Sequence, residues 1–408
     1  MVTAFVDMMG NLIVFPLIPF YAQRVLGHGP LWTFLNSLGL GGEGAVVSLM
    51  VMMFAVAQLV SSPYWGRFSD RVGRRPTLMI ALTASAIAFI VFAYADSLEL
   101  LFLLRIVQGA GGGTVGVIQA YVADATKPED RAKALGWLSA ATNAGVAIGP
   151  AIGSWAMSLG SSGPGLVAAV ITLINMAFAW RYLAESNEHA GKHASDRPKI
   201  QKPRDAVRRV VSHSGEPASR LIWIYGITMG SFQGMTTILA LFLAFKFGVT
   251  EKTIGYFFAY VGGISFVTRA LFLGKLVDYF GEPRLSRIGM VFLSAGLAGM
   301  AISPTVPILA IAVALVPLGA AFTFPCVTGL LSRVVPNHER GLYMGVQQTF
   351  GGVGRVVGPL YAGFAYDHLG HGVPFYTAAV IVLATISLSI GIEKNIPPKQ
   401  APVPAPAK

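Results

Sequence analysis

Uncharged apolar stretches of roughly 20 residues recur along the whole chain, separated by short polar segments. A helix of that length, at about 1.5 Å per residue, crosses the ~30 Å hydrocarbon layer of a bilayer. The stretches are continuously apolar, whereas barrel strands would alternate over shorter segments. The pattern therefore predicts an all-α integral membrane protein with twelve transmembrane helices in two pseudo-symmetric six-helix bundles. The predicted spans are 1–22, 44–64, 77–95, 98–121, 134–157, 164–184, 220–246, 253–273, 288–304, 307–330, 341–366 and 373–392.

Composition agrees with a membrane protein. Hydrophobic residues make up 54% of the chain and charged residues only 12%, with a mean hydropathy of +0.62. A soluble domain usually carries about twice that charge. The first stretch has no basic leader and no small-residue cleavage site, so we expect it to be a spanning helix rather than a signal peptide.

The formal net charge is +11, and the uneven distribution of the basic residues among the loops predicts how the chain is oriented in the membrane. With an even number of spans, 24 of the 30 lysines and arginines fall on one side of the membrane, and only Arg24, Lys246 and Lys252 lie in loops on the other. By the positive-inside rule both termini are expected in the cytoplasm of a cell with a bacterial-type inner membrane. The basic residues therefore do not indicate nucleic-acid binding.

The two halves of the chain repeat one another. Three landmarks recur at offsets of 208 or 209 residues: Gly66 to Asp70 with Gly274 to Asp278, Arg131 with Arg340, and Gly149-Pro150 with Gly358-Pro359. Duplicated bundles with a solute site between them near the midplane are typical of secondary transporters. We expect bundles at 1–184 and 220–393, a polar cytoplasmic linker at 185–219 and a disordered cytoplasmic tail at 394–408.

The segment between the second and third spans reads Gly66-Arg67-Phe68-Ser69-Asp70-Arg71-Val72-Gly73-Arg74-Arg75. This string, expected in a short loop, closely resembles the signature of the major facilitator superfamily, and the resemblance covers essentially the whole chain. Arg105, with Gln108-Gly109, resembles the signature in the fourth helix of the same family. The fifth span has Gly145, Gly149, Pro150 and Gly153, which resemble the antiporter signature of its drug–proton exporters. The first span, from Asp7 to Pro19, resembles the same branch, which includes the tetracycline exporters.

The resemblance implies roles for these residues. The loop would latch the halves in the outward-facing state, with Asp70 against the start of the eleventh helix and Arg74 paired with Asp124. In the second half Asp278 remains, but Gly281-Glu282-Pro283 lacks the arginine pair, so a weaker latch is expected there. The expected latch residues are Gly66, Asp70, Arg71, Gly73, Arg74, Asp124 and Asp278. The expected hinge residues, which would form the moving interface, are Gly145, Gly149, Pro150, Gly153, Gly358 and Pro359.

Asp7 is the one acid that falls well inside a span. Desolvation favours the protonated form of a buried carboxyl, so Asp7 is expected to bind and release the coupled proton. The resemblance links Arg105 to the same proton transfer. Polar and basic residues within spans are candidates for the lining of the substrate cavity: Asn11, Gln108, Gln119, Asn143, Gln233, Arg269, Gln347 and Arg355.

No phosphate-binding loop of the Walker type, no ligand-spaced histidine pair within a span and no nucleophile–base constellation occurs in the sequence. We therefore expect neither an enzyme nor a cofactor or metal site, and a proton gradient as the energy source. The expected partners are a small-molecule substrate, protons and the lipid bilayer, with the chain acting as a monomer.

The leading hypothesis is proton-coupled efflux of small organic or drug-like molecules by alternating access. The tetracycline exporters carry an acid in the ninth helix, but residues 288–304 contain none, which argues against tetracycline specificity. A second hypothesis is a uniporter, exchanger or symporter of an organic anion, because three buried arginines outnumber one buried acid. A third is a transporter-like protein that serves as a sensor or assembly factor.

Overall fold

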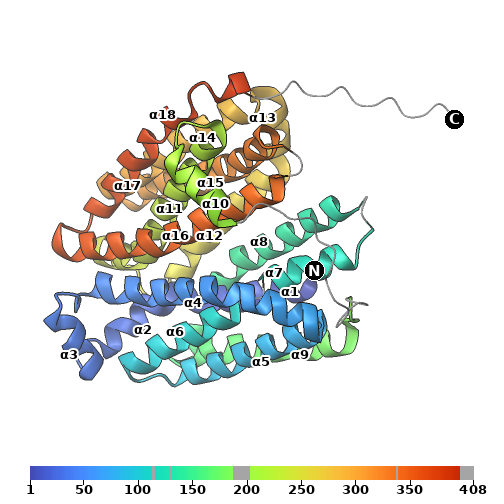
Figure 1. The fold of residues 1–408 in the computed structure, drawn as a ribbon. Coiled ribbons are helices and arrows are strands. Elements are labelled where there is room, and N and C mark those ends of the chain that lie inside the picture. The colour runs from blue at the N-terminus through green and yellow to red at the C-terminus, as the bar shows by residue number, and fades with distance from the viewer. Residues whose placement is uncertain (113–114, 128–129, 187–202, 337–338, 396–408) are drawn as a thin grey trace.

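The computed structural model describes residues 1–112, 115–127, 130–186, 203–336 and 339–395. Within these ranges the chain is helical and contains no strand, which confirms the all-α prediction for this part of the protein. The helices form two bundles, the first from the N-terminal half and the second from the C-terminal half (Figure 1).

The first bundle contains six spans, some of them interrupted. In chain order its helices are α1 (Val2–Val14), η1 (Phe15–Leu17), α2 (Ile18–Val25), α3 (Pro30–Ser37), α4 (Glu43–Val72), α5 (Arg74–Ala93), α6 (Leu98–Gly112), α7 (Val115–Asp124), α8 (Arg131–Ala156), η2 (Met157–Leu159) and α9 (Gly163–Tyr182). The first span runs through α1, η1 and α2, because Pro16 and Pro19 remove backbone donors and local 3₁₀ geometry takes their place.

The second bundle repeats this plan. Its helices are α11 (Pro217–Phe247), α12 (Ile254–Val267), the π-helical turn η3 (Thr268–Phe272), α13 (Leu273–Phe280), α14 (Glu282–Ile302), α15 (Val306–Val334), α16 (Arg340–His368), α17 (Val373–Ala384), α18 (Ile386–Ser389) and η4 (Ile392–Asn395).

Nine segments of the described chain are long and apolar enough to cross a membrane, and Val373–Ser389 is a shorter apolar helix. The other two predicted spans are α8 and α16, which have 26 and 29 residues and are therefore long enough to cross. Both helices are rich in glycine and also carry amides or an arginine. These two helices contact the opposite bundle, so their polar residues are sheltered from lipid.

The signature segment is helical rather than a loop, which corrects the sequence-based expectation. Helix α4 continues through Asp70 to Val72, and the reversal into α5 takes place at Gly73 alone, with a φ of 112°. A side chain is strained at that φ, so a glycine is needed there. The equivalent reversal in the second half occurs at Gly281, with a φ of 73°. The helix extends beyond the apolar span, because the charged residues that follow the span stay helical outside the bilayer.

The expected linker is partly structured. Residues 203–212 form the amphipathic helix α10 (Pro203–Ser212), which contacts α11 and α16. Its apolar face is buried, with Ala206 and Val210 almost inaccessible. The central part of the linker, 187–202, and the tail from residue 396 lie outside the described residues.

The glycines of α8 hold that helix against α1 of the same bundle. A Cβ at Gly145, Gly149 or Gly153 would lie 2.2–2.7 Å from a backbone oxygen of α1. Likewise, a Cβ at Gly358 on α16 would lie 2.0 Å from the oxygen of Gly230 on α11. The close contacts predicted for these four glycines are present, and they lie within each bundle. Pro150 on α8 also meets the opposite bundle, because a Cβ at Gly255 on α12 would lie 2.3 Å from its backbone oxygen. The role of these residues in a moving interface stays a prediction.

Candidate functional site

A cavity of about 560 Å³ lies between the two bundles. Its walls come from α1, η1, α2, α4, α6, α7 and α8 of the first bundle and from α11, α12, η3, α14, α15 and α16 of the second. This volume falls within the range of small-molecule binding sites. The predicted residues that line it are Asp7, Asn11, Arg105, Asn143, Gln233, Arg269 and Arg355.

Asp7 lies on α1, where it lines the central cavity and also a small chamber of about 20 Å³. Asn11, one turn further along α1, lines both spaces and donates its amide to the backbone oxygen of Asp7 at 3.0 Å. Gln108 lies beside Asp7 in the chamber but does not line the central cavity. A chamber of that size holds about one water molecule. The carboxyl is therefore placed at a junction between the cavity and the interior of the first bundle.

Arg105 projects from α6 into the central cavity and is only 5% exposed. Its guanidinium lies 5.7 Å from the centre of the Phe92 ring, a cation–π contact. Its Nη2 has no hydrogen-bond partner among the described residues, and their ion pairs do not include one between Arg105 and Asp7. An unpaired buried donor is costly, which is unusual for a group that serves only the packing of a span.

Arg269 lies in the π-helical turn η3, a rare geometry that often marks functional sites. Its Nη1 donates to the Oδ1 of Asn143 on α8, at 3.0 Å. This hydrogen bond joins the two bundles across the cavity. The sequence offers no signal for the π-helical turn, because its composition is that of an ordinary apolar helix.

Arg355 on α16 and Val146 on α8 occupy equivalent repeat positions, and both line the cavity. The cavity therefore contains three arginines and one carboxyl, and the extra positive charge comes from the second bundle.

The sequence analysis missed most of the cavity wall, which is apolar. Its unpredicted members include five phenylalanines, four methionines and one glutamine: Phe15, Phe54, Phe232, Phe258, Phe324, Met8, Met229, Met235, Met300 and Gln58. Aromatic and thioether side chains fit varied apolar ligands, since rings stack and methionine is flexible. Residue type alone does not separate these aromatic residues from lipid-facing ones. Their helical spacing relative to the polar cavity residues could have identified them.

Besides Gln108, two predicted cavity residues do not line the central cavity. Gln347 is fully buried within the second bundle, where its Oε1 accepts a hydrogen bond from Thr328 at 3.2 Å. Gln119 is exposed on α7 and is not among the residues that line the cavity. Both predictions failed because the sequence gives the depth of a residue in a span but not the face on which it lies.

The ion pair predicted between Arg74 and Asp124 is present, with Nε and Oδ2 3.1 Å apart. The Nη1 of Arg74 also pairs with the Oδ1 of Asp70 at 2.8 Å. Glu185, which the sequence analysis did not single out, accepts hydrogen bonds from the backbone N–H groups of Arg74 and Arg75 at 2.9 and 3.0 Å. These contacts tie the ends of α4, α7 and α9 to the start of α5. The contact of Asp70 with the start of α16 and the latch role stay predictions.

The bundles are in tight contact at the end of the molecule that carries α3. The carboxylate of Asp367, at the end of α16, accepts hydrogen bonds from the backbone N–H groups of Gly44 and Ala45, at 2.9 and 2.7 Å. These residues begin α4 in the opposite bundle, so Asp367 caps a helix across the interface. Arg24 pairs with Glu251 at 2.6 Å, and Ser154 accepts a hydrogen bond from the N–H of Gly255 at 2.7 Å.

Several residues near the opposite end of the interface are not closely packed. A Cβ added at Gly66, Gly136 or Gly345, near the other ends of α4, α8 and α16, would meet nothing within 4 Å. Trp137 and Tyr64, in the same region, are 64% and 65% exposed. The bundles are therefore in tight contact at the α3 end, whereas these five residues near the other end are not packed against the opposite bundle.

Proteins of known function resemble this chain along most of its length. Multidrug resistance protein 1 of Bacillus subtilis (strain 168) is 30% identical over 367 residues, which cover 89% of each chain. Tetracycline resistance protein, class B, of Escherichia coli is 23% identical over 375 residues, 90% of this chain and 88% of its own.

Solved structures show the same fold. The human organic anion transporter MFSD10 (TETRAN) superposes with a TM-score of 0.71 at 21% identity, over 95% of this chain and 97% of its own. A bacterial homolog of the human lysosomal transporter Spinster has a TM-score of 0.66 at 12% identity, over 97% and 95% of the two chains. The family model described as Major Facilitator Superfamily matches residues 1–284 and 221–408, and the chain therefore belongs to this superfamily.

Proposed function

We propose that this protein is a proton-coupled antiporter that exports small organic or drug-like molecules by alternating access. The observation that carries the proposal is the placement of Asp7 and Arg105 in one cavity between the two bundles. Relatives that match about nine-tenths of the chain bear the names of multidrug and tetracycline resistance proteins, which supports export as the direction.

The wall of the cavity favours an amphipathic cargo. Its phenylalanines and methionines provide apolar contact, while a few amides and charged groups can orient a polar end. Tetracycline itself is not the proposed cargo, because residues 288–304 lack the acid that the tetracycline exporters carry in the ninth helix.

Asp7 would bind the proton while the cavity is open to one side and release it on the other. A carboxyl that is neutral in the apolar cavity and ionised when solvated can exchange one proton per cycle. The positive charge of Arg105 would favour the release, because it stabilises the ionised carboxylate. The proton gradient is then the energy source, and no cofactor is needed.

The positive-inside distribution supports placing both termini in the cytoplasm, in the inner membrane of a bacterium. In that orientation the tightly packed α3 end, with Asp367 and the pair of Arg24 with Glu251, is the outer face. Opening to the outside would break these contacts. The signature segment with Asp70 and Arg74 would then hold the cytoplasmic ends of the bundles together, and the protein would work as a monomer.

The test uses the full chain in liposomes with an internal pH dye, an imposed proton gradient and a panel of cationic, neutral and anionic compounds. Proton flux triggered by a compound, and absent in Asp7→Asn, is the expected result. The control is Asp96→Asn, which removes an exposed acid at the turn between α5 and α6. Wild-type flux in Asp7→Asn would show that Asp7 does not carry the coupled proton. An absence of compound-triggered flux in the parent protein would refute antiport.

A second function, exchange of an organic anion, is favoured by one observation, the three arginines in the cavity. Counterflow of an anion that does not depend on the pH gradient would establish it in place of proton-coupled export.

A further inference from the structure

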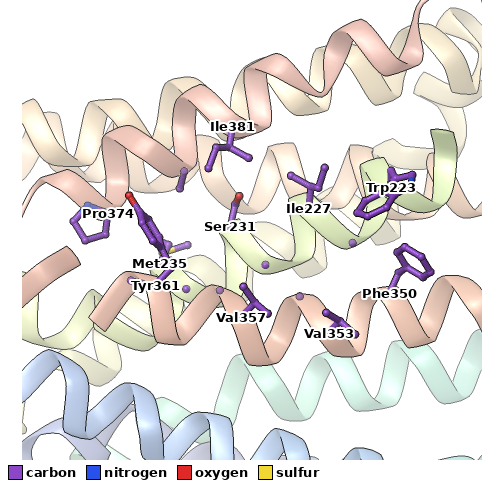
Figure 2. A pocket seen from close by; sticks show the side chains of 17 residues that line it. Trp223, Ile227, Ser231, Met235, Phe350, Val353, Val357, Tyr361, Pro374 and Ile381 are labelled. Atoms are coloured by element: carbon purple, nitrogen blue, oxygen red, sulfur yellow. The ribbon is translucent and has the colours of Figure 1, made fainter. Parts of the chain in front are cut away.

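A groove of about 290 Å³ runs along the second bundle between α11, α16 and α17, apart from the central cavity (Figure 2). Trp223 and Phe350 lie at one end, and Pro374 and Tyr361 lie at the other (Figure 2). The lining is almost entirely apolar, and all of it belongs to one bundle. The groove therefore does not depend on how the two bundles are placed relative to each other.

Glycines make the floor of the groove. Gly230 and Gly234 on α11 face Gly358 on α16, and a Cβ at Gly234 would lie 2.7 Å from the oxygen of Gly358. The helices touch through their backbones, so the surface above the contact stays hollow. A ligand in this hollow is surrounded by side chains on its flanks and by backbone beneath.

The groove faces the surroundings of the protein and not the cavity. Val353 and Val357, which point into it in Figure 2, are 50% and 56% exposed. Arg355 lies between them in sequence and lines the central cavity, so the two surfaces occupy different faces of α16. In a membrane-spanning bundle, an exposed apolar face at this depth is in contact with lipid hydrocarbon.

Trp223, at one end of the groove, is half-buried. Its indole N–H is covered by the protein itself and has no hydrogen-bond partner among the described residues, so the groove is offered the ring and not the N–H. Helix α11 has 31 residues and a length of about 46 Å, which exceeds the ~30 Å hydrocarbon layer by about 8 Å at each end. Trp223 lies about 9 Å from the start of the helix. It is therefore placed at the hydrocarbon boundary, where tryptophan is enriched and lipid ester groups lie.

We propose that this groove binds one acyl chain of a membrane phospholipid, with the ester end of the chain beside the ring of Trp223. The groove extends along α11 from Trp223 to Met235, about 18 Å at the helical rise. One leaflet contributes about 15 Å of the ~30 Å hydrocarbon layer, so an acyl chain anchored at Trp223 spans the length of the groove. Met235 lines both the groove and the central cavity, so the bound chain contacts a residue that also faces the cargo.

The experiment reconstitutes the full chain in vesicles of phosphatidylethanolamine and phosphatidylglycerol, with a small fraction of phosphatidylethanolamine that carries a diazirine in the middle of one acyl chain. After irradiation, cross-linked peptides are quantified by mass spectrometry. We expect the peptides that contain Ile227, Ser231 and Val357 to be labelled several-fold more than other lipid-exposed segments. Ser231→Phe and Val357→Phe, which fill the groove from different helices, should each reduce that labelling several-fold.

Two further variants separate a bound lipid from the surrounding bilayer. Val380→Phe places the same ring on α17 at a 66% exposed residue that does not line the groove, and it should leave the labelling unchanged. Trp223→Ala removes the ring from the end of the groove, and it should reduce the labelling several-fold. The proposal would be overturned if the labelling were spread evenly over the exposed spans. It would also be overturned if the parent and both filling variants were labelled equally. Loss of labelling in the filling variants but not in Trp223→Ala would overturn the placement of the ester end beside Trp223.

Discussion

Glu282 and Arg333 form an ion pair in the second bundle, with Oε1 and Nη2 3.3 Å apart. Their positions lie 208 and 209 residues after Arg74 and Asp124, which form the corresponding pair in the first bundle. The charges are exchanged between the two helix ends. The second bundle thus conserves the interaction while reversing its polarity, although the arginine pair of the signature is missing from its sequence.

This reversal predicts that the first bundle tolerates the same exchange. Arg74→Glu alone and Asp124→Arg alone should each lower the transport rate about fivefold, equivalent to ~1 kcal/mol for a partly exposed pair. The double variant should recover most of the wild-type rate, measured in vesicles with equal amounts of inserted protein.

Arg67→Glu serves as the control, because it reverses a charge in the same segment without touching this pair. A double variant as poor as the worse single variant would show that the arginine is needed for something other than its partner.

Asp367 is expected to keep the α3 end closed. Asp367→Ala removes two charge-assisted hydrogen bonds to the start of α4, so the population open at that end should rise about tenfold, or ~1.4 kcal/mol. Spin labels at Ser37→Cys and Lys252→Cys, on opposite bundles in a Cys326→Ser background, measure the opening as a distance distribution.

Asp367→Glu should restore much of the closed population, because it keeps the carboxylate. Asp96→Asn, an exposed acid at the same end, should leave the distances unchanged. A distribution that does not differ between Asp367→Ala and the parent would mean that other contacts hold this end.

Arg355 should determine the charge preference of the cavity. Replacing it with valine, the residue at the equivalent repeat position 146, removes one of the three positive charges. Affinity for cationic compounds should rise, and affinity for anionic ones should fall about tenfold, if the guanidinium contacts the cargo. Binding titrations with matched cationic and anionic dyes measure both changes, and Arg355→Lys, which retains the charge, should show neither in full.

The contact of Gly358 with Gly230 should limit the stability of the second bundle. A methyl group at 358 would approach the oxygen of Gly230 to 2.0 Å, so Gly358→Ala should cost about 1–3 kcal/mol through overpacking. Thermal unfolding in detergent should shift down by several degrees. Gly345→Ala, on the same helix and with nothing within 4 Å, should keep or raise the unfolding temperature, because alanine favours helix. A similar drop in the unfolding temperature of both variants would show that this contact is not the cause.

Hydrophobic length and the repeat of landmarks were enough to predict the helices, because the bilayer restricts a spanning chain to few solutions. The depth of Asp7, Arg105 and Arg355 was predictable for the same reason, since a charge inside a span needs a cavity or a partner. The Arg74–Asp124 pair followed from the resemblance of the signature segment.

The helix face was harder to predict. Gln347 and Asn143 look equivalent in the sequence, yet one is packed inside a bundle and the other faces the cavity, because tertiary packing decides the rotation of each helix. The glycines of α8 revealed a close contact but not which neighbour makes it. The π-helical turn at Arg269 and the cap formed by Asp367 depend on geometry between segments far apart in the chain. Local sequence patterns do not predict such geometry.

The cap at Asp367 also bears on the free-energy cost of the proposed antiport cycle. A proton that crosses a potential of 100 mV releases about 2.3 kcal/mol. Two hydrogen bonds to a charged carboxylate contribute energies of the same order, a few kcal/mol in total. A much stronger closure would trap the protein in one orientation, and a much weaker one would let the gradient leak. In the proposed antiport cycle, the free energy held in this cap is thus of the same order as the work that one proton would supply.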